Sequence, residues 1–93
     1  MMVTVKFYAM IKDVTRIPEV SIEMEWGTIN DVLNILADRY GKDFWEIVFN
    51  KNGQLSGNTK ILLNGTYIDY IDGLDSSISD GDSIYLFPAI GGG

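Results

Sequence analysis

The 93-residue chain contains no cysteine and no histidine. Without cysteine the protein has no disulfide bond, no thiolate nucleophile and no cysteine-held iron–sulfur cluster. Without histidine it also lacks the commonest zinc ligand and the commonest general base near neutral pH. The enzyme classes and metal proteins that depend on either side chain are therefore excluded.

Positive charge and long apolar runs are also scarce. Seven Lys and Arg stand against 13 Asp and Glu, which gives a net charge of −6 and argues against a nucleic-acid partner. An acidic surface suits docking onto a basic protein surface instead. No apolar run is long enough to span a bilayer. The N-terminal residues lack a signal-peptide pattern, so we expect a cytoplasmic protein with no membrane attachment.

Two N-terminal segments alternate between apolar and polar residues with the period of two that is typical of β-strands. Their apolar positions are Val3, Val5, Phe7 and Ala9 in the first segment and Val20, Ile22 and Met24 in the second. Glutamates fill the other face of the second segment. They are interpreted as solvated surface that discourages pairing at a sheet edge. Residues 11–17 break the pattern, and no regular element is predicted there.

Residues 28–40 show the period of an amphipathic helix. Thr28 is a good N-cap, Asp31 lies in the first turn in a near capping-box pattern, and Gly41 supplies the C-cap. The apolar stripe consists of Ile29, Val32, Leu33, Leu36, Ala37 and Tyr40. This stripe is interpreted as core. Residues 42–49 indicate a short second helix or helical turn.

The C-terminal half begins with a short apolar run over residues 60–63, which is consistent with a buried strand. The Asn64-Gly65 pair that follows is the strongest short hairpin signal, because a type I′ turn needs positive φ at both central residues. Residues 66–68 are predicted to form the short returning strand.

An acidic, irregular loop is predicted over residues 69–82, with Leu74 and Ile78 anchoring it to the core. A last strand is predicted over residues 83–87. Pro88 is expected to end it, because proline cannot donate a hydrogen bond to the ladder.

The chain stops on three glycines, Gly91, Gly92 and Gly93. Because glycine lacks a Cβ, its backbone can approach other surfaces closely. One interpretation makes the Gly93 carboxylate a reactive group that enters the narrow active site of another protein. The other is a frayed terminus or a remnant of cloning, and the tail alone leaves both open. We divide the chain into a domain of residues 1–88 and a flexible tail of residues 89–93.

The predicted elements run in the order hairpin, helix, irregular segment, short hairpin, irregular loop and last strand. This order fits an α+β domain. The expected fold is a ubiquitin-like β-grasp, a mixed sheet of about five strands with one main helix packed across one face. The last strand is expected beside the first, where it delivers the tail directly into solvent.

The chain resembles the MoaD/ThiS family of ubiquitin-like sulfur carriers, and within it the small subunit of molybdopterin synthase. The matching segments are residues 5–9, residues 28–33, Leu63-Asn64-Gly65, Leu74, Asp80-Gly81-Asp82 and Phe87-Pro88 followed by Gly92-Gly93. Two positions depart from the family pattern. Ala89 stands where the family usually has a second proline, and Gly91 adds a third glycine before the final pair.

The resemblance implies a carrier without catalytic groups of its own. An E1-like adenylating enzyme would use ATP to activate the carboxylate of Gly93, and persulfide sulfur would displace AMP to leave a thiocarboxylate. The carrier would then dock on the large subunit of molybdopterin synthase, where its sulfur goes to the pterin precursor. No cofactor or metal is expected on this chain, because ATP is used by the activating partner. Gly91 and Gly92 would let the tail enter a partner's tunnel.

Strand parity predicts the docking surface. The residues expected to face the helix are Val5, Phe7, Ile84 and Leu86. The rings that then face away from it are Tyr8, Tyr85 and Phe87, and large aromatics on an exposed sheet face indicate a partner interface. The resemblance adds Tyr67 on this side. Lys12 is a further candidate that either pairs with an acidic partner residue or is simply solvated. Ordinary surface aromatics, or cover by residues 42–49, are the alternatives.

Other functions remain open at this point. The same activated tail would serve a ubiquitin-type protein modifier that is joined to target lysines through Gly93. A related carrier would give its sulfur to thiazole synthesis for thiamine or to tRNA thiolation. A plain β-grasp interaction domain with an idle tail is the alternative from a different class. The sequence also leaves open the oligomeric state and whether Met1 or Met2 is the native start.

Overall fold

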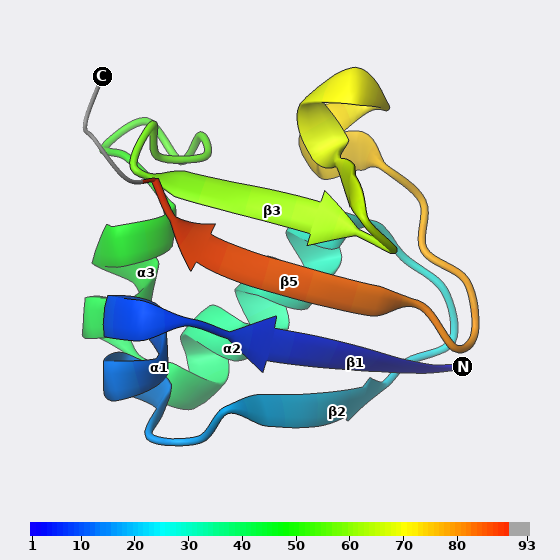
Figure 1. The fold of residues 1–93 in the computed structure, drawn as a ribbon, viewed down its shortest axis with the longest axis horizontal. Coiled ribbons are helices and arrows are strands. Elements are labelled where there is room, and N and C mark those ends of the chain that lie inside the picture. Colours follow the sequence, from blue (N-terminus) through cyan, green and yellow to red (C-terminus); the bar gives the residue numbers. More distant parts are fainter. Residues whose placement is uncertain (90–93) are drawn as a thin grey trace.

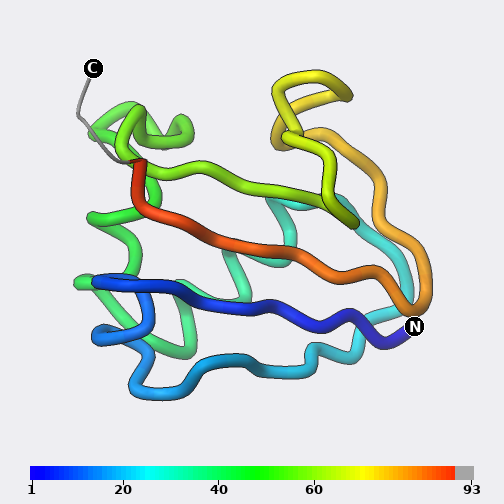
Figure 2. Tube along the Cα trace, in the orientation of Figure 1, coloured from blue at the N-terminus to red at the C-terminus, as the bar shows by residue number. Residues whose placement is uncertain are grey.

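The structure, a computed structural model, describes residues 1–89, so Gly91, Gly92 and Gly93 of the predicted tail lie outside the described residues. Within residues 1–89 five strands form one mixed sheet in the spatial order β2-β1-β5-β3-β4 (Figure 1). Their bounds are Met2–Phe7 for β1, Glu19–Glu23 for β2, Thr59–Leu63 for β3, Thr66–Tyr67 for β4 and Ser83–Pro88 for β5. β1 and β5 run parallel, and the other neighbouring pairs are antiparallel. Figure 2 shows that the last strand lies beside the first, as predicted.

The helices of the described chain gather on one side of this sheet. Helix α2 crosses behind the strands, and α1 and α3 lie beside each other at one end (Figure 1). The helical bounds are Ala9–Thr15 for α1, Ile29–Tyr40 for α2, Lys42–Val48 for α3, and Ile68–Tyr70 and Gly73–Asp75 for the short 3₁₀ turns η1 and η2. This is the expected α+β, ubiquitin-like β-grasp arrangement. Among residues 1–89, every helix falls short of the length and apolar content needed to cross a membrane.

Helix α2 begins at the predicted capping box. The Thr28 N–H donates to the Asp31 carboxylate at 2.9 Å, and the Asp31 N–H donates to the Thr28 hydroxyl at 3.4 Å. Such a cap stabilises a helix by about 1 kcal/mol. At the other end, the Gly41 N–H donates to the Ala37 carbonyl and Gly41 takes φ +85°. Both ends of α2 agree with the sequence prediction.

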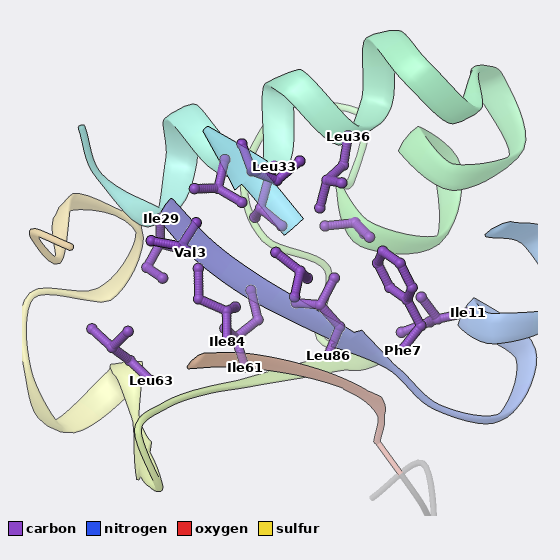
Figure 3. Packing of buried hydrophobic residues seen from close by; sticks show 14 of the residues in the cluster. Val3, Phe7, Ile11, Ile29, Leu33, Leu36, Ile61, Leu63, Ile84 and Leu86 are labelled. Atoms are coloured by element: carbon purple, nitrogen blue, oxygen red, sulfur yellow. The ribbon is translucent and has the colours of Figure 1, made fainter. Parts of the chain in front are cut away.

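The core lies between α2 and the sheet, as Figure 3 shows for the side chains that point toward each other from the two layers. Its strand and helix residues include Val3, Val5, Phe7, Ile84, Leu86, Ile29, Leu33 and Leu36, all at most 2% exposed. Each buried side chain of this size contributes about 1.5–3 kcal/mol. The predicted parity of Val5, Phe7, Ile84 and Leu86 toward the helix is confirmed.

The connection between β1 and β2 differs from the prediction. The first strand ends at Phe7, so the prediction that it reaches Ala9 was wrong, and helix α1 occupies residues 9–15 where no element was expected. Only Ile11 and Thr15 of this helix are buried. The Thr15 hydroxyl donates to the Ile17 carbonyl at 3.0 Å, which closes the turn. Two inward residues in two turns give too weak a periodic signal to recognise.

The second half of the chain follows the prediction more closely. Asn64 and Gly65 have φ values of +52° and +94°, as the predicted tight turn requires. Ile68 was assigned to the returning strand, which is incorrect: it turns inward, is 1% exposed and starts η1. Leu74 and Ile78 both pack against the core, which confirms them as the anchors of the acidic loop.

Candidate functional site

The site lies at the C-terminal end of β5, on the face of the sheet opposite the helices, called the open face below. Ile84 and Leu86 of this strand are buried, whereas Tyr85 and Phe87 alternate with them and are half-buried. Pro88 stands opposite Thr59 within the ladder, so β5 continues one residue beyond its predicted end. Strand alternation thus places two aromatic rings on the open face just before the tail.

Tyr8 and Phe87 form a stacked pair on the open face. Their ring centroids lie 4.4 Å apart with an interplanar angle of 9°, and Tyr85 stacks on Phe87 at 6.5 Å. The Tyr8 N–H donates to the Leu86 carbonyl at 3.2 Å, which ties the end of β1 to β5. Such ring pairs contribute about 0.5–1.5 kcal/mol beyond their burial. The rings of Tyr8, Tyr85 and Phe87, named the aromatic strip, therefore form a preformed apolar surface.

Tyr67 reaches the same region from β4. It is 44% exposed, stands opposite Leu62 in the ladder, and lies 6.3 Å from the ring of Tyr70. A groove of about 360 Å³ has both Tyr67 and Phe87 in its lining. The structure therefore brings three of the predicted partner-binding residues, Tyr8, Phe87 and Tyr67, onto one surface.

Lys12 is exposed on α1 at the rim of this surface. It lines a hollow of about 370 Å³ together with Tyr8 and Lys6. The Lys6 ammonium lies 5.4 Å from the centre of the Tyr85 ring, at cation–π distance. Sequence reasoning missed Lys6 and Lys60 as members of the site. Strand parity could have identified both lysines. Their chain neighbours Val5, Phe7 and Ile61 are buried, so Lys6 and Lys60 must point to the open face.

Ala9 holds the chain in an uncommon backbone conformation directly after Tyr8. Its φ is +51°, in the left-handed region, where a Cβ is sterically penalised. The chain turns there from β1 into α1, which leaves Tyr8 at the sheet and in contact with Phe87. The position of the aromatic pair thus depends on a strained backbone turn.

Replacing Ala9 with glycine is expected to make the protein up to about 1 kcal/mol more stable, because glycine tolerates positive φ. The same replacement at Ala37, inside α2, is expected to cost about 1 kcal/mol because glycine is a poor helix former. Urea unfolding of the two variants measures the contrast. Equal destabilisation at both positions would contradict a strained turn at Ala9.

Among residues 1–89 no group of three or more acidic, histidine or cysteine side chains is placed to hold a metal ion. Gly91, Gly92 and Gly93, the predicted reactive tail, lie outside the described residues. The described part of the candidate site ends at Ala89, on the rim of the groove.

Comparisons with known proteins agree with this picture. A model of the ThiS family matches residues 5–93. An Archaeoglobus fulgidus protein named as a sulfur carrier is 31% identical over 75 residues, which cover 81% of this chain and 84% of the relative.

Two solved structures are similar over nearly their whole length. The small archaeal modifier protein 1 of Methanosarcina acetivorans superposes with a TM-score of 0.85 at 31% identity, covering 99% of this chain and 96% of that protein. A Pyrococcus furiosus protein named as subunit 1 of molybdopterin converting factor has a TM-score of 0.76 at 26% identity, covering 96% and 98%. The fold of this chain is thus shared with one protein named as a small modifier and one named as a subunit of molybdopterin converting factor.

Proposed function

Since this chain belongs to the ThiS family, we propose that it is a sulfur carrier that holds sulfur as a thiocarboxylate on Gly93. Relatives of this chain are named as sulfur carriers and as small modifiers, and the resemblance to the MoaD/ThiS family stated from the sequence is confirmed. The observation that carries the proposal is that the family match extends through residue 93 and includes the three glycines.

The chemistry explains why the carrier needs an activating partner. A carboxylate is a poor electrophile, because resonance and negative charge repel a nucleophile. In the proposed reaction the Gly93 carboxylate attacks the α-phosphorus of ATP on an E1-like enzyme, and pyrophosphate leaves. Persulfide sulfur then attacks the acyl carbon and AMP leaves, after which a thiol cleaves the S–S bond and frees the thiocarboxylate. The carrier supplies only the carboxylate, so its lack of histidine and cysteine is no obstacle.

The open face supports a docking role in both steps. The aromatic strip and Tyr67 are proposed to bind the activating enzyme and the sulfur-accepting enzyme in turn, with Lys12 at the rim of the contact. Covalent geometry limits a segment of four residues to a span of about 14 Å. The catalytic groups of either partner must therefore lie within that distance of Ala89.

The proposed sulfur acceptor is the pterin precursor on the large subunit of molybdopterin synthase. The similar Pyrococcus furiosus protein named as a subunit of molybdopterin converting factor supports this choice. ATP would be used by the activating enzyme and not retained by this chain. A cytoplasmic location stays a prediction from the sequence.

A protein modifier is the second candidate. The similarity to small archaeal modifier protein 1 favours it. The activated Gly93 would then be joined to a lysine amine of a target protein. Both candidates share the adenylated tail and differ in the nucleophile that attacks it.

Intact mass spectrometry of the protein from its own host, and after incubation with an adenylating enzyme, ATP and a sulfur donor, tests the proposal. We expect a mass gain that matches replacement of one oxygen by sulfur and maps to Gly93, and no gain without ATP. Isopeptide-linked conjugates without that mass gain would favour the modifier. An unchanged mass together with the absence of such conjugates, with the enzyme active on a control carrier, would overturn both.

A further inference from the structure

The groove beside the tail has a lining that the docking prediction does not account for. It has a volume of about 360 Å³ and is lined by Lys60, Leu62, Tyr67, Phe87, Pro88 and Ala89. We name it the tail-side groove. An adjoining hollow of about 330 Å³ shares Lys60 and Tyr67 and adds Asp69 and Tyr70. The two hollows meet at Lys60, so a ligand in one is within reach of this lysine.

The strand register explains how these side chains come together. Lys60 of β3 stands opposite Phe87 of β5, and Leu62 stands opposite Tyr67 of β4. Such cross-strand neighbours lie close together on one face of a sheet. The tail-side groove is therefore apolar along Leu62 and its aromatic walls, with a lysine at one side.

Among residues 1–89, Lys60 is the single charged residue in the lining of the tail-side groove. Its ammonium lies 3.9 Å from the Asp69 carboxylate, and the two side chains are 49% and 62% exposed. An ion pair this long and this exposed contributes little stability. A carboxylate from a ligand can therefore take the place of Asp69 at small cost.

Charge complementarity selects the ligand. The whole chain carries a net charge of −6, yet the lining that residues 1–89 give the tail-side groove carries one positive charge. A cationic ligand would meet Lys60, whereas an apolar group that bears a carboxylate would bury against Leu62 and pair with the ammonium. Tyrosine is also one of the residues that most often anchor a protein interface, and Tyr67 lines this groove.

We propose that the tail-side groove receives an apolar side chain followed by a carboxylate, both from the enzyme that activates Gly93. This inference rests on the proposed function. The Ala89 N–H donates to the Asn58 carbonyl at 2.7 Å, which fastens the last described residue at the rim of the groove. A partner held by Lys60 is therefore placed in register with the start of the tail. Lys60 acts as a positioning residue that does not touch the reacting atoms.

Titration of the full chain with two small probes tests the chemistry of the groove. The probes are 3-phenylpropionate and its cationic counterpart 3-phenylpropylamine, followed by amide NMR shifts at millimolar concentration. We expect the carboxylate probe alone to shift the amides of Lys60, Leu62 and Tyr67. Lys60→Gln is expected to weaken the affinity for the carboxylate probe severalfold. Lys51 is exposed in a turn, so Lys51→Gln is expected to leave that affinity unchanged. Equal binding of both probes, or shifts that map elsewhere, would overturn the inference.

Enzyme kinetics separate this inference from the proposed function. Lys60→Glu is expected to raise the KM of the activating enzyme for the carrier at least about tenfold with kcat unchanged, because the Gly93 carboxylate is untouched. Lys60→Arg keeps the charge and is expected to restore most of the affinity. If folded Lys60→Glu protein keeps the wild-type KM, the groove does not contact the activating enzyme. The proposal that Gly93 is loaded with sulfur would not be affected by that result. A wild-type chain that is never loaded, yet binds the carboxylate probe selectively, would refute the proposed function and leave the groove chemistry standing.

Discussion

Removal of Gly92 and Gly93 is expected to abolish thiocarboxylate formation and to leave thermal unfolding unchanged. The reason is a separation of roles along the chain. Every strand and helix of the described residues lies between residues 2 and 88, and so do the 18 buried apolar residues of the core. In the proposed reaction, by contrast, the terminal carboxylate must reach the ATP and the persulfide bound by the partner. Thermal unfolding and intact mass after incubation with the activating enzyme measure the two properties on the same sample.

Two further variants sharpen this test. One extra residue after Gly93 moves the carboxylate past the reacting position and is expected to be as damaging as the deletion. Gly57→Ala is the matched control, because a Cβ there meets nothing within 4 Å and Gly57 does not take positive φ. It is expected to be loaded with sulfur normally. Full loading or full activity of the shortened chain would rule out the carrier and the modifier together and leave an interaction domain with an idle tail.

Neighbouring residues of β5 are expected to respond in opposite ways to truncation. Leu86 is fully buried against α2, so Leu86→Ala is expected to cost about 2–5 kcal/mol of unfolding free energy. Phe87 is half-buried on the open face, so Phe87→Ala is expected to cost less than Leu86→Ala: it loses two ring contacts, about 0.5–1.5 kcal/mol for each pair, and only part of a buried side chain. Its binding to the activating enzyme is expected to fall at least about tenfold, as for an aromatic anchor of an interface.

Urea unfolding and a calorimetric binding titration distinguish these effects. Because small domains have only about 5–15 kcal/mol of stability in total, Leu86→Ala is expected to show a visibly lower urea midpoint. Phe87→Ala serves as its control for the removal of a large side chain from the same strand. A Phe87→Ala protein that mainly unfolds would show that the two faces of β5 are assigned the wrong way round. Unchanged partner affinity would take Phe87 out of the interface.

Local signals in the chain were sufficient for most elements of the fold. The amphipathic period of α2, with Thr28 and Gly41 at its ends, predicts both the helix and the face that it buries. The Asn64-Gly65 pair specifies a hairpin turn because few residues accept positive φ. Helix α1 escaped detection because it buries only Ile11 and Thr15. Helix α1 is stabilised by packing against other elements, and the local sequence pattern carries no information about that packing.

The sequence by itself determined most of the elements, the face that each strand buries and the three-glycine ending. Those features depend on the spacing of residues along the chain and on the backbone preferences of individual residues. Only the tertiary structure decided which outward residues become neighbours. The parallel pairing of β1 with β5 stacks Tyr8 on Phe87, and the β3–β5 register sets Lys60 opposite the same ring. Contacts between residues so far apart in the chain arise from sheet order and register, because strand parity fixes a face but not a neighbour.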